Sequence, residues 1–87
     1  MTYTLDISDQ LDKQFTKLRK KDKKQLEGID KKIQEIVKNP YHFKPLRGDM
    51  HGARRVHIGK SFVLIFEIDE KQRIIRLLDF NHHDVIY

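Results

Sequence analysis

The sequence predicts an α+β domain with the element order β-α-α-β-β-β, in which a helical hairpin packs on one face of a twisted, mainly antiparallel sheet. Three observations lead to this prediction. Apolar residues recur at helical spacing in the first half of the chain, they recur at strand spacing in the second half, and Pro and Gly gather between the two halves. A chain of 87 residues has room for one modest core, so we expect a single domain over residues 1–87.

The first half begins with a weakly alternating strand at residues 3–7, after which Ser8 or Asp9 can accept the free N–H groups of a starting helix. This first helix carries a narrow apolar stripe, with Lys residues on its other faces. The stripe consists of Leu11, Phe15 and Leu18.

A second helix follows directly, because Asp22 and Gln25 have the spacing of a capping box. Asn39 tolerates the left-handed conformation and Pro40 cannot continue the helical hydrogen bonds, so the helix is expected to end there. Its apolar stripe consists of Leu26, Ile29, Ile33, Ile36 and Val37. The two helices therefore form a hairpin.

The second half begins with a loop over residues 41–52, which has no sustained period. In a strand at residues 54–58, alternation places Arg55 and His57 on one face and apolar residues on the other. Two more strands complete an antiparallel meander, at residues 62–68 and 73–80. The first of these two is apolar on both faces, which predicts a central strand.

The chain is basic, with 18 Lys and Arg against 13 Asp and Glu and a net charge of +5, which favours a polyanionic partner such as nucleic acid. Residues 11–24 hold seven bases and two acids, residues 41–60 hold five bases and one acid, and all five His residues follow position 41. Apolar runs are too short for a membrane span, the start lacks a signal-peptide pattern, and Cys is absent. We therefore expect a soluble, cytoplasmic protein without disulfides or Cys nucleophiles.

The remaining residue types suit phosphodiester chemistry. Metal-free cleavage of RNA needs a base for the 2′-OH proton, cations for the charge on the pentavalent phosphorus and an acid for the leaving oxygen. Arg55 and His57 share a strand face, and the tail at residues 81–87 leaves the last strand close to them. A solvated strand face and a frayed tail explain the same residues without any function.

The tail also holds His82, His83 and Asp84 in succession, a set that suggests metal ligation. Consecutive residues of an extended segment point apart, however, and no spaced set of partners is evident. We therefore expect neither a metal site nor a cofactor.

Two blocks of the sequence carry a resemblance to a known family. They are PLRGDMHGARRVHIGKSFVLIFEID and, after a further strand, the tail FNHHDVIY. Together with the short first strand and a helical hairpin that ends at Asn-Pro, they resemble the RelE/ParE superfamily of toxins from toxin-antitoxin modules, particularly its RelE and YafQ-like mRNA interferases. The resemblance covers the whole chain.

This resemblance implies a ribosome-dependent endoribonuclease that cuts mRNA in the ribosomal A site without a metal ion and so inhibits translation. It also implies a cognate acidic antitoxin of the RelB kind, which covers the sheet and helices in a hetero-oligomer. The ribosome and its mRNA are the other expected partners, and no membrane partner is expected.

The resemblance implies a catalytic set as well, in which Arg55 clamps the phosphate and a histidine acts as general base or acid. The catalytic candidates are His83, Arg55, His57 and Tyr87. The candidates for substrate binding are Lys44, Arg47, His51, Arg54, Lys60, Arg76 and His82. Many relatives carry Arg just after an aromatic residue of the third strand, where this chain has Val63, so we expect Arg55 or Arg76 to compensate.

Two other functions fit the same sequence. One is a ParE-like poison that traps DNA gyrase without a catalytic site, and the other is a plain RNA-binding domain. The histidines of the tail favour the enzyme, because a poison needs no titratable groups.

Overall fold

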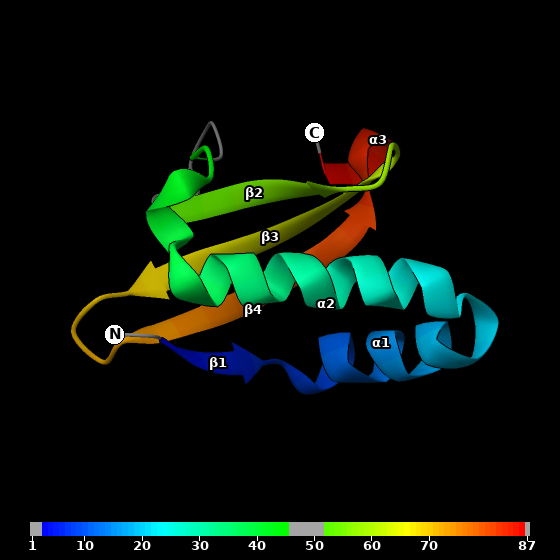
Figure 1. The fold of residues 1–87 in the computed structure, drawn as a ribbon, viewed down its shortest axis with the longest axis horizontal. Coiled ribbons are helices and arrows are strands. Elements are labelled where there is room, and N and C mark those ends of the chain that lie inside the picture. The colour runs from blue at the N-terminus through cyan, green and yellow to red at the C-terminus, as the bar shows by residue number, and fades with distance from the viewer. Residues whose placement is uncertain (1–2, 46–51, 87) are drawn as a thin grey trace.

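The computed structural model describes residues 3–45 and 52–86, with side chains described up to residue 84. The predicted order of elements is confirmed, and two helices lie against one face of a four-stranded sheet (Figure 1). The elements are β1 (Thr4–Ile7), α1 (Asp9–Lys21), α2 (Lys23–Lys38), the 3₁₀ helix η1 (Pro40–His42), β2 (Ala53–Ile58), β3 (Phe62–Asp69), β4 (Ile74–His82) and α3 (His83–Ile86). None of the helices in this part of the chain is long and apolar enough to cross a membrane.

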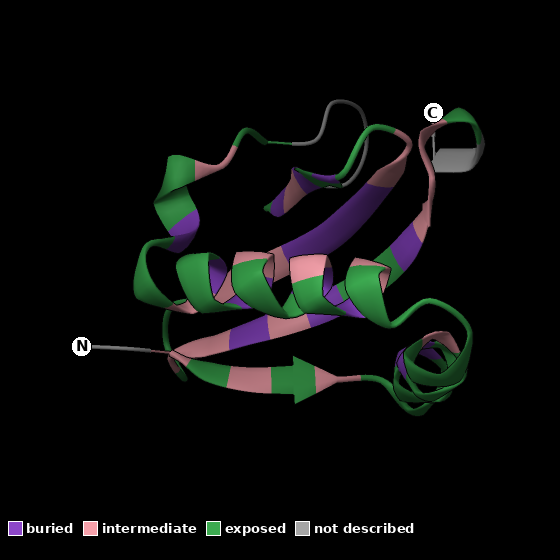
Figure 2. Cartoon of the chain, turned by 45° about the vertical axis from the view of Figure 1, so that its right-hand side comes forward, coloured by how far each residue is buried: buried purple, intermediate pink, exposed green. Residues whose placement is uncertain are grey.

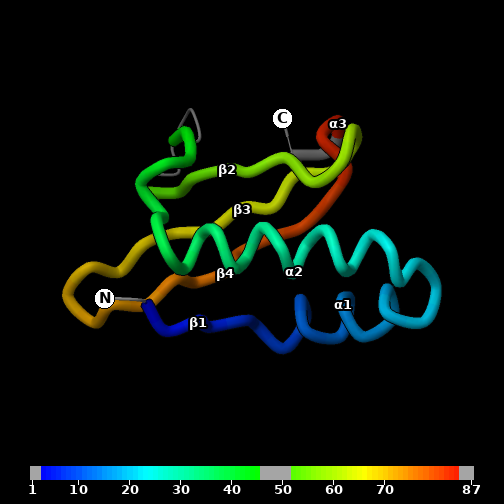
Figure 3. Tube along the Cα trace, viewed as in Figure 1, coloured from blue at the N-terminus to red at the C-terminus, as the bar shows by residue number. Residues whose placement is uncertain are grey.

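The strands of the sheet follow the order β1-β4-β3-β2. The β2–β3 and β3–β4 pairs are antiparallel, and β1 pairs with β4 in parallel. Strand β3 therefore lies between two neighbours, as its two apolar faces predicted. The tube in Figure 3 shows how the chain leaves β1, runs through the helical hairpin and returns to the far edge of the sheet at β2.

Both helices begin at the side chains that the sequence predicted. The hydroxyl of Ser8 accepts a hydrogen bond from the backbone N–H of Leu11 at 3.2 Å, and the carboxylate of Asp22 accepts one from Gln25 at 3.1 Å. Each cap satisfies a backbone donor that has no partner within its helix. Only one residue, Asp22, separates the two helices, so they form a tight antiparallel hairpin.

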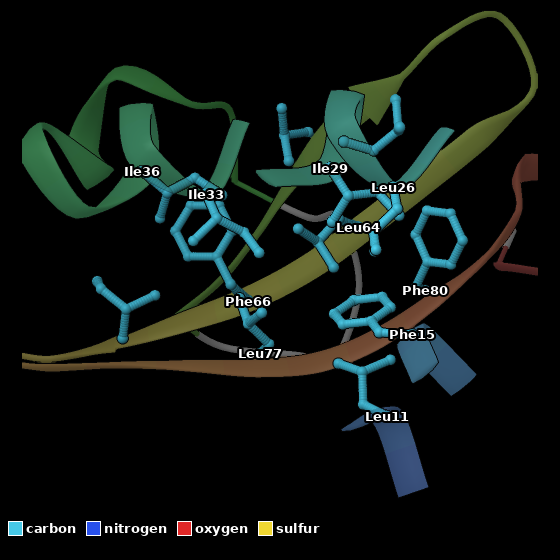
Figure 4. Close-up of a cluster of buried hydrophobic side chains, with 13 residues drawn as sticks. Leu11, Phe15, Leu26, Ile29, Ile33, Ile36, Leu64, Phe66, Leu77 and Phe80 are labelled. Carbon is cyan, nitrogen blue, oxygen red and sulfur yellow. The ribbon is translucent and has the colours of Figure 1, made fainter. Parts of the chain in front are cut away.

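The core lies between α2 and the inner strands (Figure 4). Ile29 and Ile36 of α2 and Phe66 of β3 are fully buried, and the purple segments of Figure 2 follow the same layer. Helix α1 adds Phe15, whose ring packs edge-on against Phe80 of β4 at 5.8 Å. Burial of each such side chain stabilises the fold by about 1.5–3 kcal/mol, so this layer fixes the sheet on which the candidate site lies.

The described part of the carboxyl end is not frayed, which was the alternative interpretation of this segment. Strand β4 continues to His82, which pairs with Phe62, and the short helix α3 then begins at His83. The backbone N–H of His83 donates a hydrogen bond of 2.8 Å to the carbonyl of Ser61 in the β2–β3 turn. His82 and His83 are held by these partners, which the sequence pattern does not reveal.

The face of the sheet opposite the helices, here called the open face, has its own small apolar cluster. It consists of Ala53, Val63 and Ile65. Strand β4 carries an extra residue beside this cluster, because the register with β3 shifts between Ile65 and Phe66. Such a bulge increases the local twist of the sheet and changes which side chains reach the open face.

Candidate active site

The open face carries the predicted pair from β2. Arg55 and His57 alternate with Val56 and Ile58, which are buried under the helices. In the register of the sheet, His57 lies opposite Val63 of β3, and Arg55 lies opposite Ile65. The two polar side chains therefore stand in adjacent rows on one face, as predicted.

A hollow of about 230 Å³ lies beside this pair at the β2 edge. It is lined by His42, Phe43, Lys44, Arg55, Val56 and His57. The backbone N–H of Arg55 donates a hydrogen bond of 3.1 Å to the carbonyl of Lys44, which holds the preceding segment along the strand. Two histidines, one arginine and one lysine thus line a single concave surface, here called the β2 pocket.

His42 is the member of this pocket that the sequence did not single out as a site residue. It ends η1, a turn that begins at Pro40 and takes up the first two residues of the stretch predicted as loop. Its ring packs edge-on against Phe43 at 5.3 Å, and Phe43 in turn packs against the buried Phe66 at 5.9 Å. The sequence offers one signal for this position of His42. Phe43, an apolar residue that can pack into the core, follows directly after a turn that begins at Pro40.

The second group of site candidates lies at the carboxyl end and is here called the tail cluster: His82, His83 and Asp84. The imidazoles of His82 and His83 stack with ring centres 4.6 Å apart and planes at 28°. The Asp84 carboxylate lies 3.0 Å from Nδ1 of His83 and 3.5 Å from Nδ1 of His82. The expectation that these side chains point apart is wrong, because the strand ends at His82 and the next residue is already helical.

The tail cluster and the β2 pocket lie toward the same end of the sheet. Asn81 pairs with Val63, and Val63 pairs with His57, so two strand spacings of roughly 4.8 Å each separate Asn81 from His57. His83 lies two residues beyond Asn81 and is bonded to the β2–β3 turn. Tyr87, the predicted phenol of the site, falls outside the described residues.

Arg76 has different surroundings from Arg55. Its guanidinium lies 3.0 Å from the Asp69 carboxylate, 3.7 Å from Glu67 and 3.8 Å from Asp6. The pKa of Asp69 is lowered, first by the hydrogen bond from the backbone N–H of Gln72 and then by Arg76. Arg76 therefore belongs to an acidic network rather than to the β2 pocket.

The structure places the other substrate-binding candidates apart from the β2 pocket or leaves them undescribed. Arg54 points to the helix side, where it donates a 2.6 Å hydrogen bond to the Phe43 carbonyl and lies over the Tyr41 ring. Lys60 lines a separate hollow of about 380 Å³ between α2 and the β2–β3 turn. Arg47 and His51 lie outside the part of the chain that the structure describes.

Val63 occupies the position where many relatives were expected to carry Arg. It is fully buried in the row between His57 and Asn81. Arg55 lies in the adjacent row and next to the β2 pocket, whereas Arg76 lies among carboxylates. Of the two arginines expected to compensate, Arg55 has the surroundings that suit a phosphate.

Comparison with known proteins places the chain in a family. The model of the family described as "ParE toxin of type II toxin-antitoxin system, parDE" matches residues 5–87. A protein of Methanocaldococcus jannaschii named "Putative toxin RelE4" is 49% identical over 85 residues, which cover 98% of this chain and 90% of the relative.

Solved structures share the fold. A mutant of Escherichia coli toxin RelE in the free state superposes with a TM-score of 0.79 at 20% identity, covering 98% of this chain and 87% of that one. The E. coli DinJ-YafQ toxin-antitoxin complex matches with a TM-score of 0.75 at 20% identity, covering all of this chain and 99% of the matched one. The resemblance that the sequence suggested is thus confirmed, and this chain belongs to the RelE/ParE superfamily of toxins from type II toxin-antitoxin systems.

Proposed function

We propose that this toxin is a ribosome-dependent endoribonuclease that cleaves mRNA in the A site without a catalytic metal ion. The observation that carries the proposal is the β2 pocket, in which His42, His57, Arg55 and Lys44 surround one hollow. A pocket of this composition offers proton carriers and cations, which are the groups that phosphodiester transfer requires. The 49% identity to a relative named as a RelE toxin supports the same function.

The proposed reaction is attack of a ribose 2′-oxygen on the adjacent phosphorus. The bond from the 2′-oxygen to phosphorus forms, the bond from phosphorus to the 5′-oxygen breaks, and a 2′,3′-cyclic phosphate remains. Arg55 and Lys44 balance the charge on the phosphoryl oxygens, and His57 and His83 carry the two proton transfers, one as base and one as acid. Asp84 orients the His83 ring through its contact with Nδ1. Tyr87 is a candidate for stacking on a base, or for donating the second proton in place of one of these histidines.

The positive charge of α1 supports binding to the ribosome. This helix carries Lys13, Lys17, Arg19, Lys20 and Lys21, and most of its surface is exposed. Cations on an exposed helix neutralise phosphates and add salt-dependent affinity for RNA. The proposed substrate is therefore mRNA held within a large ribonucleoprotein rather than free RNA.

The test uses ribosomes stalled on a defined mRNA with an open A site. We expect purified protein to cut within the A-site codon and to leave a cyclic phosphate, both seen by mapping of the RNA ends. A 2′-deoxy substitution at the attacking nucleotide removes the nucleophile and should abolish the cut. Cleavage that survives this substitution, or no cleavage by folded protein, would contradict the proposal.

A second candidate function follows from the description of the matching family, which is ParE. Under this alternative the protein traps DNA gyrase, and the β2 pocket serves binding alone. An assay of gyrase supercoiling separates the two functions, because an interferase leaves supercoiling unchanged. Inhibition of supercoiling together with intact mRNA would favour the gyrase poison.

We further propose that an acidic antitoxin of the RelB kind holds the toxin inactive in a hetero-oligomer. The similar YafQ and Pyrococcus horikoshii RelE structures are complexes with DinJ and RelB. An acidic partner complements the net charge of +5 of this chain. Co-expression with the acidic product of an adjacent reading frame should restore growth and yield a stable complex.

A further inference from the structure

The tail cluster has a property that the proposed nuclease reaction does not use. Among the described residues it is one group in which three metal-ligating side chains meet, and one potential ligand atom from each lies within 4.8 Å of the other two. Two imidazoles and one carboxylate form a donor set that suits zinc and neighbouring divalent transition metals. We propose that His82, His83 and Asp84 bind one such cation.

The separations within the cluster match what a cation needs. A tetrahedral ion with bonds of about 2.0–2.1 Å holds its ligand atoms roughly 3.4 Å apart. The Asp84 carboxylate places Oδ1 3.0 Å from Nδ1 of His83 and Oδ2 3.5 Å from Nδ1 of His82, so it reaches both imidazoles. The two stacked rings have to rotate out of their stack to direct both lone pairs at one ion.

The hydrogen bonds of the cluster set the chemistry of one imidazole. The backbone N–H of Asp84 donates a hydrogen bond of 3.2 Å to Nδ1 of His82, so this nitrogen accepts through its one lone pair. A cation that binds Nδ1 has to displace this hydrogen bond, and the neutral imidazole is the form that ligates a metal. With both imidazoles neutral the three side chains carry a formal charge of −1, which attracts a cation.

The backbone under the cluster is fixed from two sides. The N–H of His83 is bonded to Ser61, and the N–H of His82 donates a 2.9 Å hydrogen bond to the side chain of its neighbour Asn81. The His82 ring also packs edge-on against Phe62 at 5.6 Å. These contacts hold the ligands in place before a cation arrives, which lowers the entropic cost of binding.

Exposure makes the site accessible. The side chains of His82, His83 and Asp84 are 40%, 44% and 74% exposed, so a cation with three protein ligands would keep at least one position for water or another ligand. Bound cation would occupy a nitrogen of His83 and withdraw that ring from proton transfer. This consequence for activity rests on the proposed function, whereas binding itself does not.

The test is a titration of metal-free protein with Zn²⁺ alone, followed by calorimetry, with Co²⁺ absorption as a second probe. Wild type should bind one cation per chain. His83→Ala and Asp84→Ala should each weaken binding at least about tenfold, because each removes a ligand. His57→Ala is the matched control, since it removes an exposed imidazole outside the cluster and should leave binding unchanged.

Circular dichroism of each variant in EDTA checks that the fold is kept. As a variant-free measurement, imidazole NMR signals of His82 and His83 in wild-type protein should shift on addition of Zn²⁺, and those of His57 should not. Binding that survives the double variant His82→Ala/His83→Ala, or a stoichiometry of one cation per two chains, would overturn the site. Cation binding by a protein that cleaves no mRNA would refute the proposed function and leave the site standing.

Discussion

The open face of the sheet carries arginine at two places, and the two differ in what surrounds them. Arg55 lines the β2 pocket with Lys44 and two histidines. Arg76 lies one row further along the sheet, within 4 Å of three carboxylates. A polyanion is attracted to the first position and repelled by the acids around the second.

The comparison shows that a residue type alone does not identify a phosphate clamp. In the sequence both arginines lie on predicted strands, and both were candidates to replace the missing cation at Val63. The two arginines differ only in the residues that the neighbouring strands place beside them. Glu67 of β3 and Asp6 of β1 both lie opposite Arg76. We propose that Arg55 binds the phosphate and that Arg76 has a structural role.

The largest expected effect comes from Arg55→Ala. Loss of a cation that meets developing charge on a phosphoryl group should slow cleavage of ribosome-bound mRNA about 10²–10³-fold. The matched control is Arg76→Ala, which should slow cleavage by less than about threefold because its partners lie outside the pocket. Single-turnover cleavage rates measure both effects. Equal losses from the two variants would contradict the proposal that Arg55, and not Arg76, binds the phosphate.

A second prediction concerns the histidines of the β2 pocket. His57→Ala should reduce the cleavage rate about 10²-fold, as expected for loss of a proton carrier. His42→Ala should reduce the cleavage rate at most about tenfold, since this imidazole lies on η1 against Phe43 and not on the strand that carries Arg55. A pH–rate profile that loses one limb in His57→Ala and keeps both in His42→Ala would support the assignment. The reverse pattern would indicate that His42 of η1, and not His57, carries the proton.

The sequence predicted much of this arrangement. The strand alternation that set Arg55 and His57 on one face, the caps at Ser8 and Asp22 and the central position of β3 all follow from local rules and are confirmed. Local rules carry this information because each depends on neighbours within a few residues.

Other features depend on contacts between distant segments and were not predicted. The stacked His82 and His83 rings require an abrupt change from strand to helix, which is fixed by a hydrogen bond to Ser61. The position of His42 beside the pocket depends on Phe43 reaching Phe66 across the domain. The spacing of residues along the sequence does not indicate which distant segments come into contact.

A smaller effect is expected on stability at the acidic end. Arg76→Ala should lower Tm by about 2–6 °C, because it leaves three neighbouring carboxylates without their common cation. Arg55→Ala should change Tm less, since the described residues that line its pocket include no carboxylate. Thermal unfolding at low and high salt measures the difference, and the Arg76 effect should shrink as salt rises. Identical Tm values for the two variants would contradict the structural role of Arg76.

The smallest effect is a pH dependence at the β3–β4 turn. Hydrogen bonds from the hydroxyls of Tyr41 and Tyr3, with Arg73 beside them, lower the pKa of Glu70 below its ordinary value of 4.5. The stabilisation from this ionised carboxylate is therefore present above pH 4.5 and is lost as pH falls through the lowered pKa.

Glu70→Gln removes that titration, so its Tm should fall less steeply on acidification than the Tm of the wild type. Far-UV circular dichroism melts between pH 6 and pH 3 compare the two slopes. Parallel curves would mean that Glu70 contributes nothing to acid sensitivity.

The most direct test of the central claim locates bound RNA on the open face. A short RNA with a 2′-O-methyl group at each ribose cannot be cleaved, so it can be titrated into labelled protein and followed by NMR. We predict that the signals of His42, Lys44, Arg55 and His57 shift together with a common affinity that falls steeply with salt. Shifts centred instead on Arg76 and its carboxylates, with the β2 pocket unchanged, would contradict the account.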